Sequence, residues 1–263
     1  LFLLFGYATY FIVCAAIAVA ISALTKTSRG SLITLIVIWI AFWIVVPRAT
    51  QNIGASVYPT PSTSQFDKLL ETDLAKEGDS HNPNDPKFAE LKREVLAKYN
   101  VKDVKDLPFN YSGFVMSQAE EISSAIFRKH YGELLENFKR QNWVAEITSL
   151  FNPYLAIRHF SMATAGSDFT AYENFQWQAE EFRFNMIQKL NDLHTNKIKA
   201  EHDRTQKVSR QIWEEFPKFE YQEPTIFESL SKQILAVFSV IFWLILAGLL
   251  VWFLPRSELR LEA

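Results

Sequence analysis

A polar loop between residues 78 and 88 holds the densest group of side chains that could do chemistry. Asp79, His81 and Asp85 lie within seven positions of one another, and carboxylate and imidazole groups are common metal ligands. The loop is therefore a weak candidate for a divalent-cation site. The competing interpretation is a turn between two helices, because Asp, Asn, Gly and Pro are typical of turns. The loop also lacks the distal bidentate glutamate of an EF-hand, which favours the turn.

The rest of the chain carries no recognisable catalytic signature. It has no glycine-rich phosphate loop of the form G-x-x-x-x-G-K-[ST], no G-x-S-x-G elbow and no H-E-x-x-H zinc motif. Glu120 and Glu121 are adjacent, so on a helix they point about 100° apart. They fit a solvated helix face or a contact with another helix. We predict no catalytic and no cofactor-binding residue in this chain, and we expect it not to be an enzyme.

Charged residues are distributed unevenly along the 263 residues. They make up 21% of the chain, and the formal net charge is −2, which gives no indication of nucleic-acid binding. None of them falls in residues 1–24, 30–47 or 233–255. The charges are concentrated between these three uncharged runs, so the average composition conceals a division of the chain into apolar and polar segments.

The three uncharged runs predict transmembrane helices. As helices they would rise about 36, 27 and 34 Å, at roughly 1.5 Å per residue, against a hydrocarbon core of about 30 Å. Three buried helices of a soluble protein are the alternative, but such long helices rarely lack a charge on every face. We therefore expect a lipid bilayer around two helices at 1–24 and 30–47 and around a last helix at 229–255.

Basic residues next to the predicted spans indicate their direction. Lysine and arginine favour the cytoplasmic ends of spans. The short loop after the first span and the tail 256–263 are therefore predicted to be cytoplasmic, and residues 48–228 extracytoplasmic. Arg48 is the one contrary charge. The residues that determine this topology are Lys26, Arg29, Arg256 and Arg260.

The segment 48–228 has the pattern of a helical domain. Apolar residues recur at helical spacing along 115–150 and 172–193, and no strand pattern of any length competes. A break at 151–153 and a short helix separate these two stretches, which predicts a helical hairpin or bundle. The predicted fold class is mainly α: a polytopic membrane protein with three transmembrane helices and a helical extracytoplasmic domain.

The predicted spans contain no Asp, Glu, Lys, Arg or His, the side chains expected of a proton relay or an ion pathway. Tyr7 and Tyr10 are among the few polar groups in the first span, and they could line a substrate path. Helix–helix contact within a larger bundle is the competing interpretation. The chain begins at Leu1, inside an apolar run and without a basic leader, so we expect it to be the C-terminal fragment of a longer protein.

The order of these segments resembles the C-terminal half of type-2 ABC export permeases, the ABC-2 group. More narrowly, it resembles a bacterial subgroup with a large extracytoplasmic domain of unknown function before the last transmembrane helix. In that arrangement the three spans would be the fourth, fifth and sixth of six. The motifs that carry the resemblance are YPTPSTSQF (58–66), GDSHNPNDP (78–86), DLPFNYSGF (106–114), LFNPYLAIRHFSMATAGSDF (150–169) and FQWQAEEFR (175–183).

The resemblance implies a permease subunit of an ATP-driven exporter in the bacterial inner (plasma) membrane. ATP and Mg²⁺ would be bound by a separate ATP-binding ABC subunit, and a second permease subunit would complete a homodimer or heterodimer. Two other functions stay open. One is a membrane-anchored extracytoplasmic binding or sensor module without transport activity. The other is a tethered enzyme, for which the sequence offers no set of nucleophile, base or metal ligands.

Overall fold

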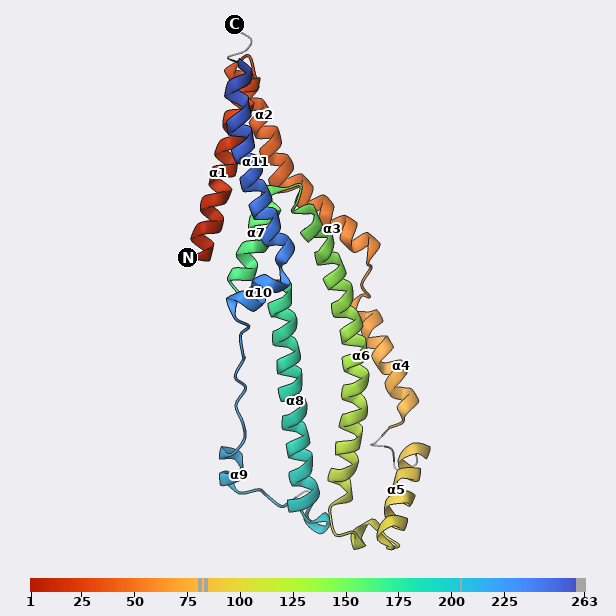
Figure 1. Cartoon of the computed structure of the whole chain (residues 1–263). Coiled ribbons are helices and arrows are strands. Elements are labelled where there is room, and N and C mark those ends of the chain that lie inside the picture. The colour runs from red at the N-terminus through yellow and green to blue at the C-terminus, as the bar shows by residue number, and fades with distance from the viewer. Residues whose placement is uncertain (80–81, 83–84, 204, 259–263) are drawn as a thin grey trace. The chain divides into compact units, whose positions relative to one another are not determined.

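The computed structural model of the chain is built almost entirely of helices (Figure 1). It describes residues 1–79, 82, 85–203 and 205–258. No strand occurs among these residues, so the prediction of a mainly α fold is confirmed. The elements are α1 (Phe2–Leu24), α2 (Ser28–Ile40), the π-helical turn η1 (Ala41–Val45), α3 (Val46–Val57), α4 (Thr63–Glu77), α5 (Pro86–Tyr99), the 3₁₀ turn η2 (Val104–Asp106), α6 (Tyr111–Thr148), α7 (Pro153–Thr164), α8 (Phe169–Lys197), the 3₁₀ turn η3 (Ala200–His202), α9 (Arg210–Glu214), α10 (Ile226–Lys232) and α11 (Ile234–Glu258).

The prediction of three candidate membrane spans is confirmed. The helix of the second candidate span does not end at Pro47, where the sequence predicted its end, because α3 continues it to Val57. The last span begins at Ile234 rather than at residue 229, because α10 and α11 are separate helices that meet at Gln233. The helices long and apolar enough to cross a membrane are Phe2–Leu24, Ser28–Val57 and Ile234–Phe253.

The helix of the second candidate span continues past Pro47 because a π-helical turn precedes the proline. In this turn the amide of Val46 donates to the carbonyl oxygen of Ala41, five residues earlier. In the same pattern, the carbonyl of Phe42 would accept from the amide of the residue five positions later. That residue is Pro47, which has no N–H. The side-chain Nδ2 of Asn152 donates to this carbonyl at 2.8 Å. A residue from another element thus supplies the hydrogen bond that the proline removes.

Side-chain caps begin the helices of the polar middle of the chain. Ser62 and Gln65 form a reciprocal capping box at the start of α4. Asp85 accepts from the backbone at the start of α5, where Pro86 occupies the first turn. Asn152 does the same at the start of α7. These capping residues satisfy amides that the first turn of a helix leaves without a partner.

Contacts divide the chain into two compact units. Unit 1 is Leu1–Thr60, Glu136–Phe175 and Gln222–Ala263, and unit 2 is Pro61–Leu135 and Gln176–Tyr221. The predicted extracytoplasmic segment 48–228 is therefore divided between the two. Its central part, which includes α7, belongs to the same unit as the candidate spans.

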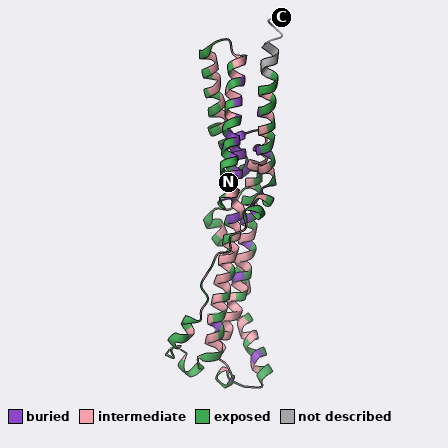
Figure 2. Cartoon of the chain, turned by 60° about the vertical axis from the view of Figure 1, so that its left-hand side comes forward, coloured by how far each residue is buried: buried purple, intermediate pink, exposed green. Residues whose placement is uncertain are grey.

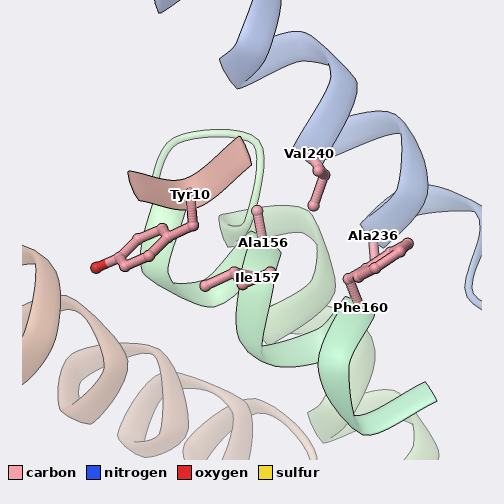
Figure 3. Close-up of a cluster of buried hydrophobic side chains, with 6 residues drawn as sticks. All are labelled: Tyr10, Ala156, Ile157, Phe160, Ala236 and Val240. Atoms are coloured by element: carbon pink, nitrogen blue, oxygen red, sulfur yellow. The ribbon is translucent and has the colours of Figure 1, made fainter. Parts of the chain in front are cut away.

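The core of unit 1 forms where α7 packs against α1 and α11 (Figure 3). Ile157 and Phe160 of α7 are buried there beside Ala236 of α11. Gly6 of α1 permits the close approach, because a Cβ atom at this position would lie 2.7 Å from Cε1 of Phe160. The packing of unit 1 thus requires a residue without a side chain at position 6.

Unit 2 consists of α4, α5, α9 and the adjoining parts of α6 and α8. Polar and aromatic contacts join the two long helices: Ser117 Oγ donates to Gln188 Oε1 at 2.7 Å, and the rings of Tyr131 and Trp177 meet edge to face at 6.0 Å. Many residues along α6 and α8 are half-buried, as the colouring in Figure 2 shows. Contacts between half-buried side chains therefore hold this unit together, and few of its residues are fully buried.

Candidate functional site

An apolar groove of about 420 Å³ lies in unit 1 between α1, the second candidate span and the start of α7. Its lining residues come from segments far apart in the sequence, so the groove forms only when the chain folds. Aromatic and aliphatic side chains supply most of its surface, and three of the lining residues, Tyr10, Tyr154 and Cys14, also carry a hydroxyl or thiol group. The lining residues are Tyr10, Phe11, Cys14, Ile17, Leu35, Ile36, Ile38, Trp39, Phe42, Trp43, Pro153 and Tyr154.

Trp43 organises the aromatic wall of this groove. Its ring stacks on Tyr154 with 4.4 Å between centroids and on Trp39 with 6.0 Å. Its Nε1 donates to the hydroxyl of Tyr10 at 2.8 Å. Trp43 belongs to η1, and π-helical turns of this kind occur frequently at functional sites. The contacts of this one side chain join α1, the second span and α7.

Of the two tyrosines that the sequence suggested for a substrate path, only Tyr10 is among the lining residues of the groove. The Tyr7 hydroxyl lies 3.2 Å from Oγ of Ser161 on α7. Tyr7 thus makes the helix–helix contact that was its competing interpretation. Tyr10 also contributes to the core of unit 1, so it serves packing and lines the groove at once.

A buried layer of polar side chains adjoins the groove through Trp243, whose ring contacts the ring of the lining residue Phe42. The hydroxyls of Ser149 and Ser239 lie 2.7 Å apart, and both residues are fully buried. The indole Nε1 of Trp243 donates to the carbonyl of Ser149 at 3.2 Å. This layer ties α11 to the end of α6. The sequence showed these serines only as isolated small polar residues, and only the fold places them opposite each other.

Titratable side chains gather where α8 begins and α10 ends. Nε2 of Gln233 donates to Oδ2 of Asp168 at 3.1 Å, and both residues are buried. Burial, together with the neighbouring Asp168 carboxylate, raises the pKa of Glu146, while a hydrogen bond from Gln233 opposes this shift. The pKa of His159 is lowered to about 4, first by burial and then by the charge of Arg158. This cluster was not predicted, because its members lie on four different elements.

Unit 2 contains a separate charged cluster around Arg183. Its guanidinium donates to Oε1 of Glu120 at 2.8 Å, to Oε2 of Glu180 at 2.6 Å and to Oγ of Ser124 at 2.8 Å. These carboxylates raise the pKa of Arg183 above its usual range. Glu120 is therefore a partner of another helix, which was one of its two predicted roles, and the cluster fixes α6 to α8.

One sequence family matches the chain. It is described as Domain of unknown function (DUF3526), and the match covers residues 67–222, more than half of the chain. The chain belongs to the DUF3526 family. No curated protein and no solved structure matches it. The matched region of this DUF3526 protein begins within α4 and ends before α10, so it lies between the second and the third candidate spans.

The acidic residues of the predicted metal loop have structural contacts in this DUF3526 protein. Oδ1 of Asp85 accepts from the amides of Lys87 and Phe88, and its Oδ2 accepts from the amide of Asp79 at 2.9 Å. These hydrogen bonds lower the pKa of Asp85, and the bond from the Asp79 amide contributes most. His81 lies outside the described residues. Among the residues that the structure describes, no three His, Cys, Asp or Glu side chains are grouped to hold a metal ion.

The predicted topology residues occupy the ends of the candidate spans. Lys26 lies in the loop between α1 and α2, and Arg29 lies in the first turn of α2. Arg256 belongs to the last turns of α11, but its side chain is outside the described part of the structure, as is the whole of Arg260. The side of the membrane on which these residues lie stays a prediction.

Proposed function

We propose that this DUF3526 protein is the permease subunit of an ATP-driven ABC exporter of the ABC-2 type in the bacterial inner membrane. The observation that carries the proposal is the aromatic groove between the first two candidate spans of a chain whose family domain precedes the last span. The order of segments and the motifs that resemble ABC-2 permeases support it.

The groove suits an apolar or amphipathic substrate. Its surface is mostly aromatic and aliphatic, and the Tyr10 hydroxyl gives it a polar group already held in place by Trp43. Ligand sites commonly combine an apolar surface with a few fixed polar groups. We assign Tyr10 and Trp43 to the wall of the substrate path.

The energy for export would come from a partner. The chain has no phosphate-binding loop, so a separate ATP-binding ABC subunit would bind ATP and Mg²⁺ on the cytoplasmic side. A second permease subunit, identical or related, would complete the path. In the proposed topology Lys26 and Arg29 face the cytoplasm, and residues 48–228 form the extracytoplasmic domain.

A membrane-anchored binding module without transport is the second candidate. It is favoured by a groove of about 870 Å³ in unit 2, between α4, α5 and α6. Both acidic residues, such as Asp67 and Glu71, and apolar residues, such as Leu70 and Met116, line this groove. Such a surface could capture a basic or amphipathic ligand without any ATPase.

Co-purification separates the two candidates. The full-length protein, tagged and extracted in mild detergent from its own host, should retain an ATP-binding ABC subunit. The permease proposal predicts a stable complex with that subunit. A protein that is always recovered without an ATPase, although folded, would favour the binding module.

A further inference from the structure

A second cavity in unit 1, of about 260 Å³, is bounded by one face from each of three helices. Pro47 and Gln51 of α3 are spaced by four residues. The lining residues of α6 and those of α7 both follow the spacing i, i+3, i+4, i+7. They are Phe138, Gln141, Asn142 and Ala145 of α6, and Leu155, Arg158, His159 and Met162 of α7. Positions with this spacing share a helix face. The three faces therefore converge on one space, with Phe169 of α8 completing its lining.

The wall that α3 and α6 form is firmly packed. A Cβ atom at Gly54 would lie 3.1 Å from the carbonyl oxygen of Gln141, so the two helices are in close contact there. Nε2 of Gln141 donates to the carbonyl of Tyr58 at 2.6 Å. Thr50, on α3 next to the cavity, is buried. The cavity is therefore a feature of the packed fold and does not depend on a loop.

The polar groups of the cavity fit an anion. Arg158 is the only charged residue in its lining, is exposed, and forms no ion pair with any carboxylate in the described part of the chain. His159 is buried, and its Nε2 has no hydrogen-bond partner within the described residues. Neither Asp168 nor Glu146 belongs to the lining, and Asp168 accepts from Gln233 while Glu146 accepts from Asn142.

Along the helix of the second candidate span, the cavity lies where lipid headgroups are expected. From Ser28 to Pro47 the helix advances 47 − 28 = 19 residues, or about 29 Å, which is close to the hydrocarbon thickness of about 30 Å. If Ser28 lies at one surface of the bilayer, Pro47 and Gln51 lie in the headgroup layer of the opposite leaflet. The apolar residues Phe138, Leu155 and Met162 in the same lining would meet the less polar part of a lipid.

We propose that this cavity binds the headgroup of an anionic phospholipid, with the phosphate against Arg158 and hydrogen bonds from the side-chain amide of Gln51 and the imidazole of His159. The shared chemistry is a phosphate next to an apolar moiety, so a soluble phosphate ester is the alternative source. The site does not depend on transport activity, and it lies outside the groove assigned to the substrate path.

The test is lipid binding by the full-length protein, purified in detergent and freed of lipid. Thermal unfolding is followed with increasing dioleoylphosphatidylglycerol, with dioleoylphosphatidylcholine, or with glycerol 3-phosphate. We expect saturable stabilisation by phosphatidylglycerol and little by the other two. Arg158→Gln should weaken the apparent affinity for phosphatidylglycerol by about tenfold, as expected for a charge-assisted hydrogen bond.

Two further variants make the result specific. Arg48 is also exposed, lies next to Pro47 and is outside the cavity lining, so Arg48→Gln is the matched control and should leave the affinity unchanged. Ala145→Phe fills the cavity without a change of charge and should abolish saturable binding. Equal losses in the two arginine variants, undiminished binding in Ala145→Phe, or glycerol 3-phosphate binding as tightly as the lipid would each overturn the proposal.

Discussion

The side-chain amide of Asn152 donates a hydrogen bond across 2.8 Å to the carbonyl oxygen of Phe42, 110 positions earlier in the chain. The π-helical pattern pairs this carbonyl with Pro47, which has no N–H to donate. The same Asn152 accepts from the amides of Tyr154 and Leu155 at the start of α7. One buried side chain thus completes the second span and begins the helix that packs against the other two.

Asn152→Ser should destabilise the protein by about 1–3 kcal/mol, the usual cost of leaving a buried backbone group without a partner. Serine can still cap α7, but it is too short to reach Phe42. Pro47→Ala in the same chain should recover part of the loss, because it restores an N–H opposite that carbonyl. The measurement is thermal unfolding in detergent. Asn137→Ser, which removes only a 3.5 Å contact to Pro59, is the control and should cost far less.

Gly6→Ala should destabilise unit 1 by about 1–3 kcal/mol, the range for overpacking a core. The new methyl group would meet the ring of buried Phe160, and Phe160→Leu in addition should relieve the clash. Gly248→Ala in the last span is the matched control, since a Cβ atom there has no neighbour within 4 Å. Equal unfolding temperatures for the two alanine variants would show that α1 and α7 do not approach as described.

Stability should fall between pH 6.5 and about pH 4 because of His159. Its folded pKa of about 4 lies below the ordinary 6.5, so over this interval the unfolded chain binds the proton and the folded chain does not. The difference corresponds to about 3 kcal/mol at 1.36 kcal/mol per pKa unit. His159→Gln should flatten the dependence, measured by unfolding at a series of pH values. The raised pKa of Glu146 acts in the opposite sense, so the comparison is best made in a Glu146→Gln background.

The proposed topology predicts which positions a thiol reagent can reach. In a chain with Cys14 replaced by alanine, Ser28→Cys should react with a membrane-impermeant maleimide only after the cells are opened. Asp79→Cys should react in intact cells whose outer barrier is permeabilised. The reverse pattern would place residues 48–228 in the cytoplasm and remove the basis of the export proposal.

The spans and helices of this chain are largely readable from its sequence. The uncharged runs located all three candidate spans, and the break at 151–153 marked the boundary between α6 and α7 that the structure confirms. These features depend on residues close together in the chain, which is why composition and spacing suffice to find them.

The candidate site was only partly predictable, because its contacts join distant segments. Tyr10 could be singled out as a polar group in an apolar run, but nothing near it indicated Trp43 or Tyr154 as neighbours. The helix boundary at Pro47 was wrong because the compensating donor, Asn152, belongs to another element. The sequence also did not indicate that α7 belongs to the same unit as the candidate spans. Ile157 and Phe160 are apolar helix positions, and their spacing does not identify the helices against which they pack.

Measurement of ATP hydrolysis tests whether this protein is a permease driven by a separate ATPase. The full-length protein is reconstituted in vesicles with the ATP-binding ABC subunit that co-purifies with it, and vanadate-sensitive hydrolysis is measured for each subunit and for the pair. We expect no hydrolysis by this protein alone. The rate for the pair should exceed that of the ATP-binding subunit and should fall when the candidate spans are deleted. If the ATP-binding subunit hydrolyses ATP at the same rate with and without this protein, the proposed permease function is wrong.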